Sequence, residues 1–509
     1  MDTTSLWQGT AARTACLPTL QTDIVVDVAI VGAGITGLTT AMRLVEAGRR
    51  VAVLEADRVG GGSSGHSTGN LYAPVDMGLA TLERERDEDA VRQVVAGRAA
   101  AVDLIEATVA RLGLECGFRR VPWHLIAADA AHVRAIEIEH AAAVRAGLPA
   151  RLMDGAAVGL HPAVALERAL RIDAQAQFQP LDYLRQLLLR IAGENCLVFE
   201  NTRVLAVDDA AGAVRTEQGS VTAAAIVLAT HTPAGIHLVQ SQLETVREYA
   251  IAAPLHDAQP APGIYWSLGA DNHSLRSHTA FGRPYLVVVG SAHPAGAAVG
   301  DERYRRLDAF ARDRFPIGPV EYRWSAQRYR ARDKLPFIGR NVDAARTWIA
   351  TGFSADGLVY GTLAGMLLAD GILGRVHPCH GLYDPARLLS GGRPDGFKRE
   401  STGPAAPDRL PELDAITQAR LADLPPCRSR KIAVGGQPVA VYRRADGALL
   451  AVAGKCSHMG CELTWNAAET SWDCHCHGSR FGPDGRVLEG PALAPLGAAA
   501  LAPGRDTPA

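Results

Sequence analysis

The chain has little charge imbalance and no long apolar run. Its 52 Lys and Arg residues nearly offset 54 Asp and Glu residues, which leaves a formal charge of -2. This offers no sequence-wide basic surface for phosphates and argues against nucleic acid as a partner. No run of about 18 uncharged apolar residues occurs, and the N-terminus lacks the basic and apolar regions of a secretory signal. We therefore expect a cytoplasmic protein without a transmembrane segment.

Cysteine is sparse and unevenly placed. The chain has nine cysteines. Five are scattered, as buried core thiols usually are, but four fall in one short segment, at Cys456, Cys461, Cys474 and Cys476. In a reducing compartment such a cluster favours a metal site over a disulfide scaffold.

The length allows more than one domain. A chain of 509 residues exceeds a single hydrophobic core, so two or three domains are expected. Residues 376–412 are rich in Pro and Gly with little periodicity, which predicts a linker. Beyond it, short strands with Gly and Asp-Gly turns predict a small β domain.

A nucleotide-binding turn is predicted near the N-terminus. Residues 27–31 and 51–55 have the apolar pattern of buried strands, and residues 38–47 have helical periodicity. The turn between them reads Gly32-Ala33-Gly34-Ile35-Thr36-Gly37, a G-x-G-x-x-G motif. Its glycines allow a tight turn and close approach of a pyrophosphate, while Glu55 and Ala56 follow where a carboxylate can accept from ribose hydroxyls. The alternative is a Gly-rich packing turn without a ligand.

The region between the glycine turn and the linker has a less regular pattern. Residues 87–145 are rich in Ala and Leu, so we expect helices there, forming a lid or a partner surface. From residue 197 the apolar period changes to two, and the β-like runs of residues 256–300 predict an inserted antiparallel sheet. A helix is expected over residues 358–373.

Several segments resemble the D-amino-acid oxidase superfamily of FAD enzymes, over about residues 25–385. The Gly/Ser-rich loop after the second strand adds backbone amides beside a pyrophosphate, through Gly62, Ser63, Ser64, His66 and Thr68. "ENTRVLAVD" resembles the strand whose valine, here Val204, meets the adenine. "GFSADGLVYGTLAGMLLAD" resembles the helix whose first residues, here Gly357, Leu358 and Val359, point at the flavin. The resemblance implies FAD, since NAD would explain none of these later segments.

His66 has two interpretations. His66-Ser67-Thr68-Gly69 is similar to the H-x-x-G at which some relatives attach FAD covalently. The other interpretation, which we favour, is a loop histidine that is hydrogen-bonded to the backbone.

The C-terminal cluster pairs two thiols with two imidazoles. Cys456 and His458 form C-x-H, and Cys474 and His477 form C-x-x-H. Zinc could use four such ligands. However, this spacing with the following Gly-Ser is similar to Rieske domains, where the cysteines and histidines hold the two irons of a [2Fe-2S] cluster.

The resemblance to Rieske proteins of cytochrome bc complexes also implies a disulfide between Cys461 and Cys476, with two free thiols as the alternative. Phe481 replaces a tyrosine that donates to a ligand cysteine in those relatives, which implies a lower potential.

Together these features predict a fold of class α/β + β. We expect a Rossmann-like FAD-binding domain with an inserted antiparallel substrate sheet, followed by an all-β Rieske domain, in an arrangement that is similar to a group of bacterial fusion proteins. The oxidase-like unit is placed at residues 1–385, with FAD-binding parts at about 25–85, 175–240 and 325–385 and substrate or lid parts at about 86–174 and 241–324. The linker is placed at 386–415 and the Rieske domain at 416–503.

The combination predicts an FAD-dependent oxidoreductase. A small-molecule amine or amino acid would give a hydride to FAD, and the cluster would pass electrons singly to an acceptor such as a quinone, cytochrome or ferredoxin. Candidate substrate-binding residues are Arg328, Tyr329 and Arg330, because arginine pairs with carboxylates and the two arginines share one side of a strand. The alternatives are an oxygenase or N-demethylase that uses dioxygen and a non-catalytic redox sensor or electron carrier.

Overall fold

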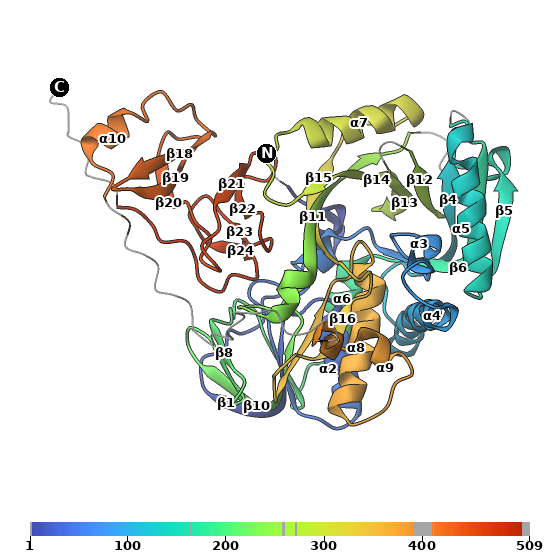
Figure 1. Cartoon of the computed structure of the whole chain (residues 1–509), viewed down its shortest axis with the longest axis horizontal. Coiled ribbons are helices and arrows are strands. Elements are labelled where there is room, and N and C mark those ends of the chain that lie inside the picture. Colours follow the sequence, from blue (N-terminus) through green and yellow to red (C-terminus); the bar gives the residue numbers. More distant parts are fainter. Residues whose placement is uncertain are drawn as a thin grey trace.

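The computed structural model describes residues 3–161, 164–256, 260–269, 272–389, 410 and 412–500. Figure 1 shows a helix-covered sheet at the bottom, a second large sheet at the upper right and two small sheets at the upper left. The expected fold class is confirmed. Most of the expected linker, including residues 390–409, lies outside the described residues.

The first sheet carries the glycine turn. Its main strand order is β16-β17-β10-β1-β2-β7. The strands are β1 (Ile24–Val31), β2 (Val51–Leu54), β7 (Cys196–Phe199), β8 (Ala206–Asp208), β9 (Ala213–Arg215), β10 (Ser220–Leu228), β16 (Phe337–Arg340) and β17 (Thr347–Thr351). β1 pairs in parallel with both β2 and β10. The carboxyl ends of parallel strands share one edge, so the loops that follow β1 and β2 meet there.

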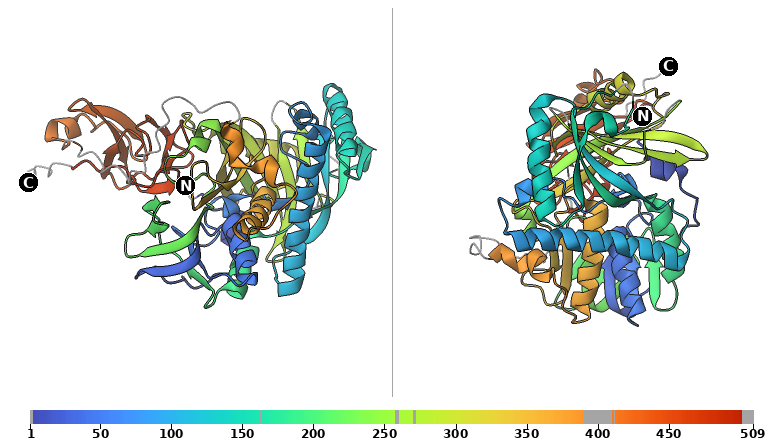
Figure 2. Two further views of the ribbon diagram at one scale, coloured as in Figure 1. Left: turned by 60° about the horizontal axis from the view of Figure 1, so that its bottom comes forward. Right: turned by 90° about the vertical axis from the view of Figure 1, so that its right-hand side faces the viewer.

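Helices cover this sheet and fix that edge. They include α2 (Ile35–Glu46), α4 (Glu88–Leu112), α6 (Pro180–Ile191) and α8 (Gly357–Ile372). α2 and α8 pack so closely that a Cβ on Gly365 would lie 2.6 Å from the Cβ of Thr39. α4 begins at its N-cap Asp87, ends at the left-handed Gly113 and packs across α8 (Figure 2, right).

The second sheet has the order β15-β11-β14-β13-β12-β4-β6-β3, with β5 paired to β6. Its strands are β3 (Asn70–Leu71), β4 (Arg119–Ala127), β5 (Ala150–Asp154), β6 (Arg168–Gln177), β11 (Leu243–Pro254), β12 (Ile264–Leu268), β13 (Ser274–Ala280), β14 (Arg283–Pro294) and β15 (Tyr322–Ala331). Its pairs are antiparallel except for β12 with β4. Accompanying helices are α1 (Leu6–Thr10), α3 (Leu79–Leu82), α5 (Val133–Arg145) and α7 (Glu302–Arg314).

The expectation of helix across residues 87–145 is wrong in the middle. Residues 119–127 form β4, between α4 and α5. β4 contains Pro122, which opposes a helix interior and here lies where the register with β6 shifts, between Val121 and Trp123. Trp123 and Ile126 are buried when this segment pairs with its two neighbouring strands. That burial stabilises the strand by more than helix propensity would stabilise a helix.

The beginning of the expected linker is packed against the oxidase-like unit. α9 (His380–Tyr383) and the 3-10 turn η5 (Pro385–Leu389) follow α8. Tyr383 is fully buried, and the Arg387 guanidinium lies 3.7 Å from the ring centre of Phe337. The Pro/Gly composition from residue 376 therefore does not mark the end of the packed unit.

The C-terminal part has two small sheets. After α10 (Ala415–Ala419), the first sheet joins β18 (Ser429–Val434), β19 (Gln437–Arg443) and β20 (Leu449–Ala453). The second sheet joins β21 (Leu463–Asn466), β22 (Ser471–Cys474), β23 (Arg480–Phe481) and β24 (Val487–Glu489). Its core contains the buried Trp472 and Phe481 together with Cys456 and Cys474. No helix in the described ranges has the length and apolar character that a membrane span requires.

Candidate active site and metal centre

The turn between β1 and α2 leaves no room for side chains at its glycines. Gly32 has a φ of +102°, and a Cβ there would lie 2.7 Å from the carbonyl oxygen of Ala229. A Cβ on Gly37 would lie 2.0 Å from the carbonyl oxygen of Gly32. The backbone of the turn is therefore open to close approach by a ligand. The N-terminus of α2 favours an anionic group at this position.

A cavity of about 400 Å³, the first cavity, lies over this turn. Most residues expected to bind FAD line it, namely Gly32, Gly34, Ile35, Thr36, Glu55, Ala56, Gly62, Ser63, Ser64, Val204, Gly357 and Leu358. Ala33, Gly37 and Val359 do not line it, since they pack within the turn and helix, while His66 and Thr68 line a neighbouring cavity. The set fits a dinucleotide: glycine backbone, hydroxyls and one terminal carboxylate.

That carboxylate belongs to Glu55. It accepts hydrogen bonds from the backbone amides of Ala33, at 2.8 Å, and Asp57, at 3.1 Å. Burial raises its pKa, while these two amides lower it. Glu55 is thus held at the end of β2, where a ribose could bond to it.

The Gly/Ser-rich loop folds over α2. Ser64 Oγ accepts from the amide of Ile35 at 3.1 Å. His66 Nδ1 contacts the carbonyl oxygen of Gly62 at 2.9 Å, as in the backbone-bonded interpretation. Burial lowers the pKa of His66, while the hydrogen bond with the Gly62 carbonyl oxygen raises it. Ser63 Oγ lies 2.9 Å from Nδ1 of His231, a residue that the sequence analysis did not single out.

A second cavity, of about 650 Å³, adjoins the first. The two share Ser63, Ser67, His231, Gly357 and Leu358, so they meet at the start of α8. Aromatic side chains form much of its wall: Tyr72, Trp123, Trp266 and Trp324. An apolar, aromatic wall with a few polar groups is typical of a small-molecule site, and the shared rim places this cavity next to the first one.

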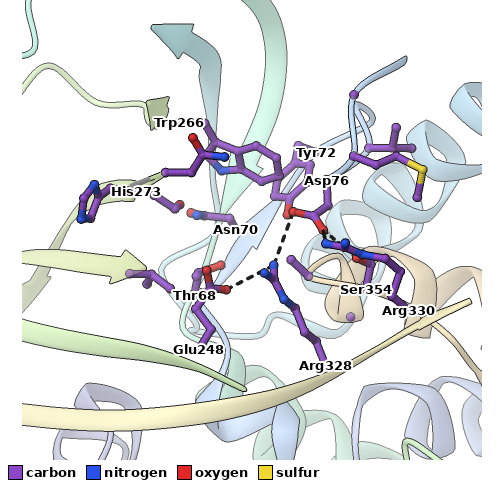
Figure 3. Close-up of a pocket in the computed structure, with 18 of the residues that line it drawn as sticks. Thr68, Asn70, Tyr72, Asp76, Glu248, Trp266, His273, Arg328, Arg330 and Ser354 are labelled. Atoms are coloured by element: carbon purple, nitrogen blue, oxygen red, sulfur yellow. Dashed lines mark hydrogen bonds and ion pairs between the residues drawn. The ribbon is translucent and has the colours of Figure 1, made fainter. Parts of the chain in front are cut away.

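Charges of both signs face each other in the second cavity (Figure 3). Arg328 NH1 lies 3.4 Å from Glu248 and 3.6 Å from Asp76, and Arg330 NH2 lies 3.6 Å from Asp76. Burial raises the pKa of Glu248, while Arg328 opposes that shift. These are long ion pairs, so each group has hydrogen-bonding capacity left for a ligand.

Tyr329 lies apart from the two arginines. It points to the opposite face of β15, lines the first cavity, and is not among the residues that line the second. Side chains alternate along a strand, which separates Tyr329 from its neighbours. The structure thus does not bring all three sequence candidates together.

The start of α8 is anchored by a buried ion pair. Arg98 NH1 and Asp356 Oδ2 lie 3.0 Å apart, and both side chains are almost completely buried. Asp356 also accepts from the Tyr72 hydroxyl, at 2.8 Å, and from the amide of Asp76, at 3.0 Å. Burial raises the pKa of Asp356 to about 6, with Arg98 opposing the shift. One network therefore connects α4, α8 and the wall of the second cavity.

The second cavity also contains polar atoms without a protein partner. Asn70 Oδ1 and Trp266 Nε1 are buried and make no hydrogen bond within the described residues. Both residues line the cavity. One acceptor and one donor are thus left for a bound molecule.

The expected metal ligands approach each other in two pairs, Cys456 with Cys474 and His458 with His477. The Cys474 thiol donates to Cys456 and lowers the pKa of Cys456 to about 7. The rings of His458 and His477 are 5.0 Å apart, and His477 Nδ1 is buried without a partner among the described residues. Two thiols and two imidazoles fit a [2Fe-2S] cluster that has one iron on sulfur and one on nitrogen.

A disulfide joins the two loops that carry these residues. It connects Cys461 and Cys476, whose Cα atoms are 6.6 Å apart. The sulfur atoms of this pair lie within 4.8 Å of the Cys474 sulfur. Ser479 is fully buried and accepts from the amide of Ala492 at 3.1 Å.

The C-terminal domain docks beside the first cavity. Arg247 of β11 lies 3.1 Å from Glu489 and 3.3 Å from Glu469. His458 Nε2 contacts the carbonyl oxygen of Gly235 at 3.1 Å, which leaves the other ring nitrogen for a metal. The C-terminal domain therefore contacts the oxidase-like unit both at the first cavity and at His458, one of the expected metal ligands.

Comparisons with known proteins agree with this arrangement. The DAO family, described as FAD dependent oxidoreductase, matches residues 27–371, and the Rieske [2Fe-2S] domain matches residues 415–500. The chain is 29% identical over 488 residues to the Rieske 2Fe-2S iron-sulfur protein YhfW of Bacillus subtilis, covering 94% of each chain.

Solved structures share the oxidase-like fold. Glycine oxidase from Geobacillus kaustophilus aligns with a TM-score of 0.60 and 19% identity, covering 74% of this chain and 100% of that one. L-proline dehydrogenase from P. horikoshii aligns with a TM-score of 0.61 and 18% identity, covering 73% of this chain and 100% of that one. The chain belongs to the DAO family of FAD-dependent oxidoreductases and carries a C-terminal Rieske [2Fe-2S] domain.

Proposed function

We propose that the protein oxidises the C–N bond of an amine or amino acid in the second cavity and delivers the electrons through its Rieske cluster to an external acceptor. One observation carries this: a cavity with facing charges opens onto the first cavity at the start of α8. When bound, FAD accepts a hydride and a Rieske cluster transfers single electrons. Glycine oxidase and L-proline dehydrogenase, named for amino-acid substrates, share this fold.

We assign the FAD site to the first cavity. The glycine turn and the start of α2 would hold the diphosphate, and Glu55 would accept from the ribose. Val204 would contact the adenine, while Gly357 and Leu358 at the start of α8 would face the flavin. Ser63 and His231 lie on the rim shared with the second cavity, on the path between cofactor and substrate.

The charges of the second cavity favour a zwitterionic substrate, which carries both an ammonium and a carboxylate group. A carboxylate would bind Arg330, whose ion pair with Asp76 is 3.6 Å long. A cationic nitrogen would bind Glu248, whose desolvated carboxylate gains from a new positive neighbour. The aromatic wall would exclude water and orient the reacting carbon.

The cluster would be held by Cys456, Cys474, His458 and His477. Two contacts connect its loops to β15: Gln327 Nε2 donates to the carbonyl oxygen of Gly478 at 2.8 Å, and the Tyr329 hydroxyl donates to that of Gly490 at 3.3 Å. Gly478 follows His477 directly. These contacts would keep the cluster close to the first cavity, so that transfer is intramolecular.

An anaerobic substrate screen tests the proposal. Purified holoenzyme is mixed with amines, N-methyl amino acids and imino acids, and the flavin absorbance and the Rieske EPR signal are followed together. The proposal expects flavin bleaching first and cluster reduction second, with two irons and no zinc per chain. Failure of every amine and amino acid to bleach the flavin would contradict it and favour a redox carrier. A third iron with dioxygen-dependent turnover would favour an oxygenase.

A further inference from the structure

The C-terminal domain lines the first cavity with five consecutive residues, Arg486–Gly490, which we call the covering segment. The segment contains β24 and lines the same cavity as Gly32, Gly34 and Glu55 of the oxidase-like unit. A cavity that the oxidase-like unit would otherwise leave open is therefore walled by a second domain.

Backbone contacts hold the covering segment to the oxidase-like unit. Arg203 NH2 donates to the carbonyl oxygen of Val487 at 3.2 Å. The amide of Gly235 donates to the carbonyl oxygen of Pro491 at 2.9 Å, directly after the segment. Because Arg203 also lines the cavity, the contact lies at the cavity itself.

Buried ion pairs also hold this segment, through Glu489, which lines the first cavity. Glu489 accepts from Arg480 of its own domain at 2.9 Å and from Arg247 of β11 at 3.1 Å. Arg247 is 2% exposed and also pairs with Glu469, which accepts from the Tyr304 hydroxyl at 2.6 Å. A buried cation shared by two acids of the other domain is costly to leave unpaired, so it favours the docked arrangement.

The covering segment also brings a cation. Arg203 and Arg486 are the two arginines that line the first cavity. The Arg486 side chain is 71% exposed and its ion pair with Asp484 is 3.8 Å long, so its guanidinium has donors left for an anionic ligand.

We propose that the Rieske domain completes the FAD site: the covering segment closes over the dinucleotide, Arg486 contributes to its binding, and FAD leaves only when the domain undocks. The inference rests on the assignment of FAD to the first cavity and needs no substrate. Because coupling between two sites is reciprocal, bound FAD would in turn stabilise the docked domain.

Titration of FAD into the deflavinated full-length protein tests this, with the dissociation constant read from flavin fluorescence. Arg486→Ala removes the cation at the cavity, and we expect affinity to fall about tenfold, the effect of one charge-assisted hydrogen bond. The matched control is Arg444→Ala, which removes an exposed arginine paired with Asp446 in the same domain but outside the cavity. Its affinity should equal that of the wild type.

Arg247→Met separates docking from direct contact, because Arg247 does not line the first cavity. We expect FAD to dissociate about tenfold faster from this variant. Tyr304→Phe, a milder change on the same network, should shift the rate in the same direction and serves if Arg247→Met does not fold. Unchanged iron content and Rieske visible circular dichroism would establish that each variant retains its C-terminal domain.

Hydrogen–deuterium exchange gives a readout independent of affinity. FAD should slow exchange in residues 484–491 and leave residues 444–448 unchanged. Wild-type affinity and release rate in all three interface variants, with no protection of residues 484–491, would overturn the inference. No substrate is present in these titrations, so a negative substrate screen would not bear on them.

Discussion

Gln327 of β15 donates a hydrogen bond to the carbonyl oxygen of Gly478, which follows His477 directly. The same amide nitrogen lies 2.7 Å from the Tyr329 hydroxyl, which donates to Gly490. One glutamine therefore connects the second sheet to the loop that carries His477, at a point where both of its strand neighbours, Ala326 and Arg328, line the second cavity.

Gln327→Leu keeps the size of this side chain but removes its bonds. One hydrogen bond contributes about 1 kcal/mol, so the docking equilibrium constant should fall about fivefold, and electron transfer from flavin to cluster should slow by up to that factor. Rapid-freeze EPR after stopped-flow mixing measures the cluster step, and flavin bleaching measures the step before it. Gln437→Leu, on the exposed start of β19, is the control. An unaltered cluster rate would show that the contact has no part in the transfer.

Glu248→Gln should raise KM for a cationic substrate about tenfold and leave kcat nearly unchanged, because the carboxylate would contribute binding rather than chemistry. Steady-state kinetics with the hit from the screen measure both constants. Glu244→Gln lies on the same strand but is exposed, so it should behave as the wild type. A fall in kcat with constant KM would instead assign Glu248 a role at the reacting carbon.

The disulfide should stabilise the C-terminal domain. It closes a loop with a sequence separation of 15, for which chain entropy gives about 3 kcal/mol of stability. Cys461→Ala/Cys476→Ala should therefore lose its Rieske absorbance at a lower urea concentration than the wild type. Cys427→Ser removes an exposed free cysteine of the same domain and should not. Equal midpoints for all three proteins would contradict a stabilising role.

Glu489 predicts a specific acid dependence. Burial alone would raise the pKa of Glu489, but the neighbouring Arg480 and Arg247 lower it to about 2. A carboxyl with a depressed folded-state pKa stabilises the protein above its unfolded value, near 4.5, and loses that contribution as the pH falls toward 2.

At pH 7, Glu489→Gln should therefore lower the free energy of unfolding by about 3 kcal/mol, and the difference from the wild type should disappear as the pH approaches 2. Urea denaturation at several pH values measures it. Glu462→Gln removes an exposed pair with Lys431 and should show little difference at any pH. A pH-independent difference for Glu489→Gln would assign its effect to packing.

Local motifs made part of the site predictable. The glycine turn and the C-x-H and C-x-x-H loops place their functional atoms within a few residues, so spacing alone limits the chemistry. The family resemblances that these segments carry implied the fold class, FAD and the Rieske cluster, and the comparisons confirm them.

The charged wall of the second cavity was not predictable in the same way. Asp76 follows β3, Glu248 lies on β11 and Arg328 on β15, and only the pairing of β11 with β15 brings the latter two together. Single acids in a chain with 54 of them carry no signal before the sheet register is known. The covering segment was hidden for the same reason, because its role depends on how two domains dock.

Arg98 limits how far the second cavity can change shape around a bound molecule. Its guanidinium donates to the carbonyl oxygens of Tyr72 and Ala73 while pairing with Asp356, and no part of its side chain reaches solvent. One cation thus connects the wall of the second cavity to the first turn of α8, so the two cannot move independently. We therefore expect a rigid cavity, which selects among substrate analogues by their shape and does not change its conformation to fit them.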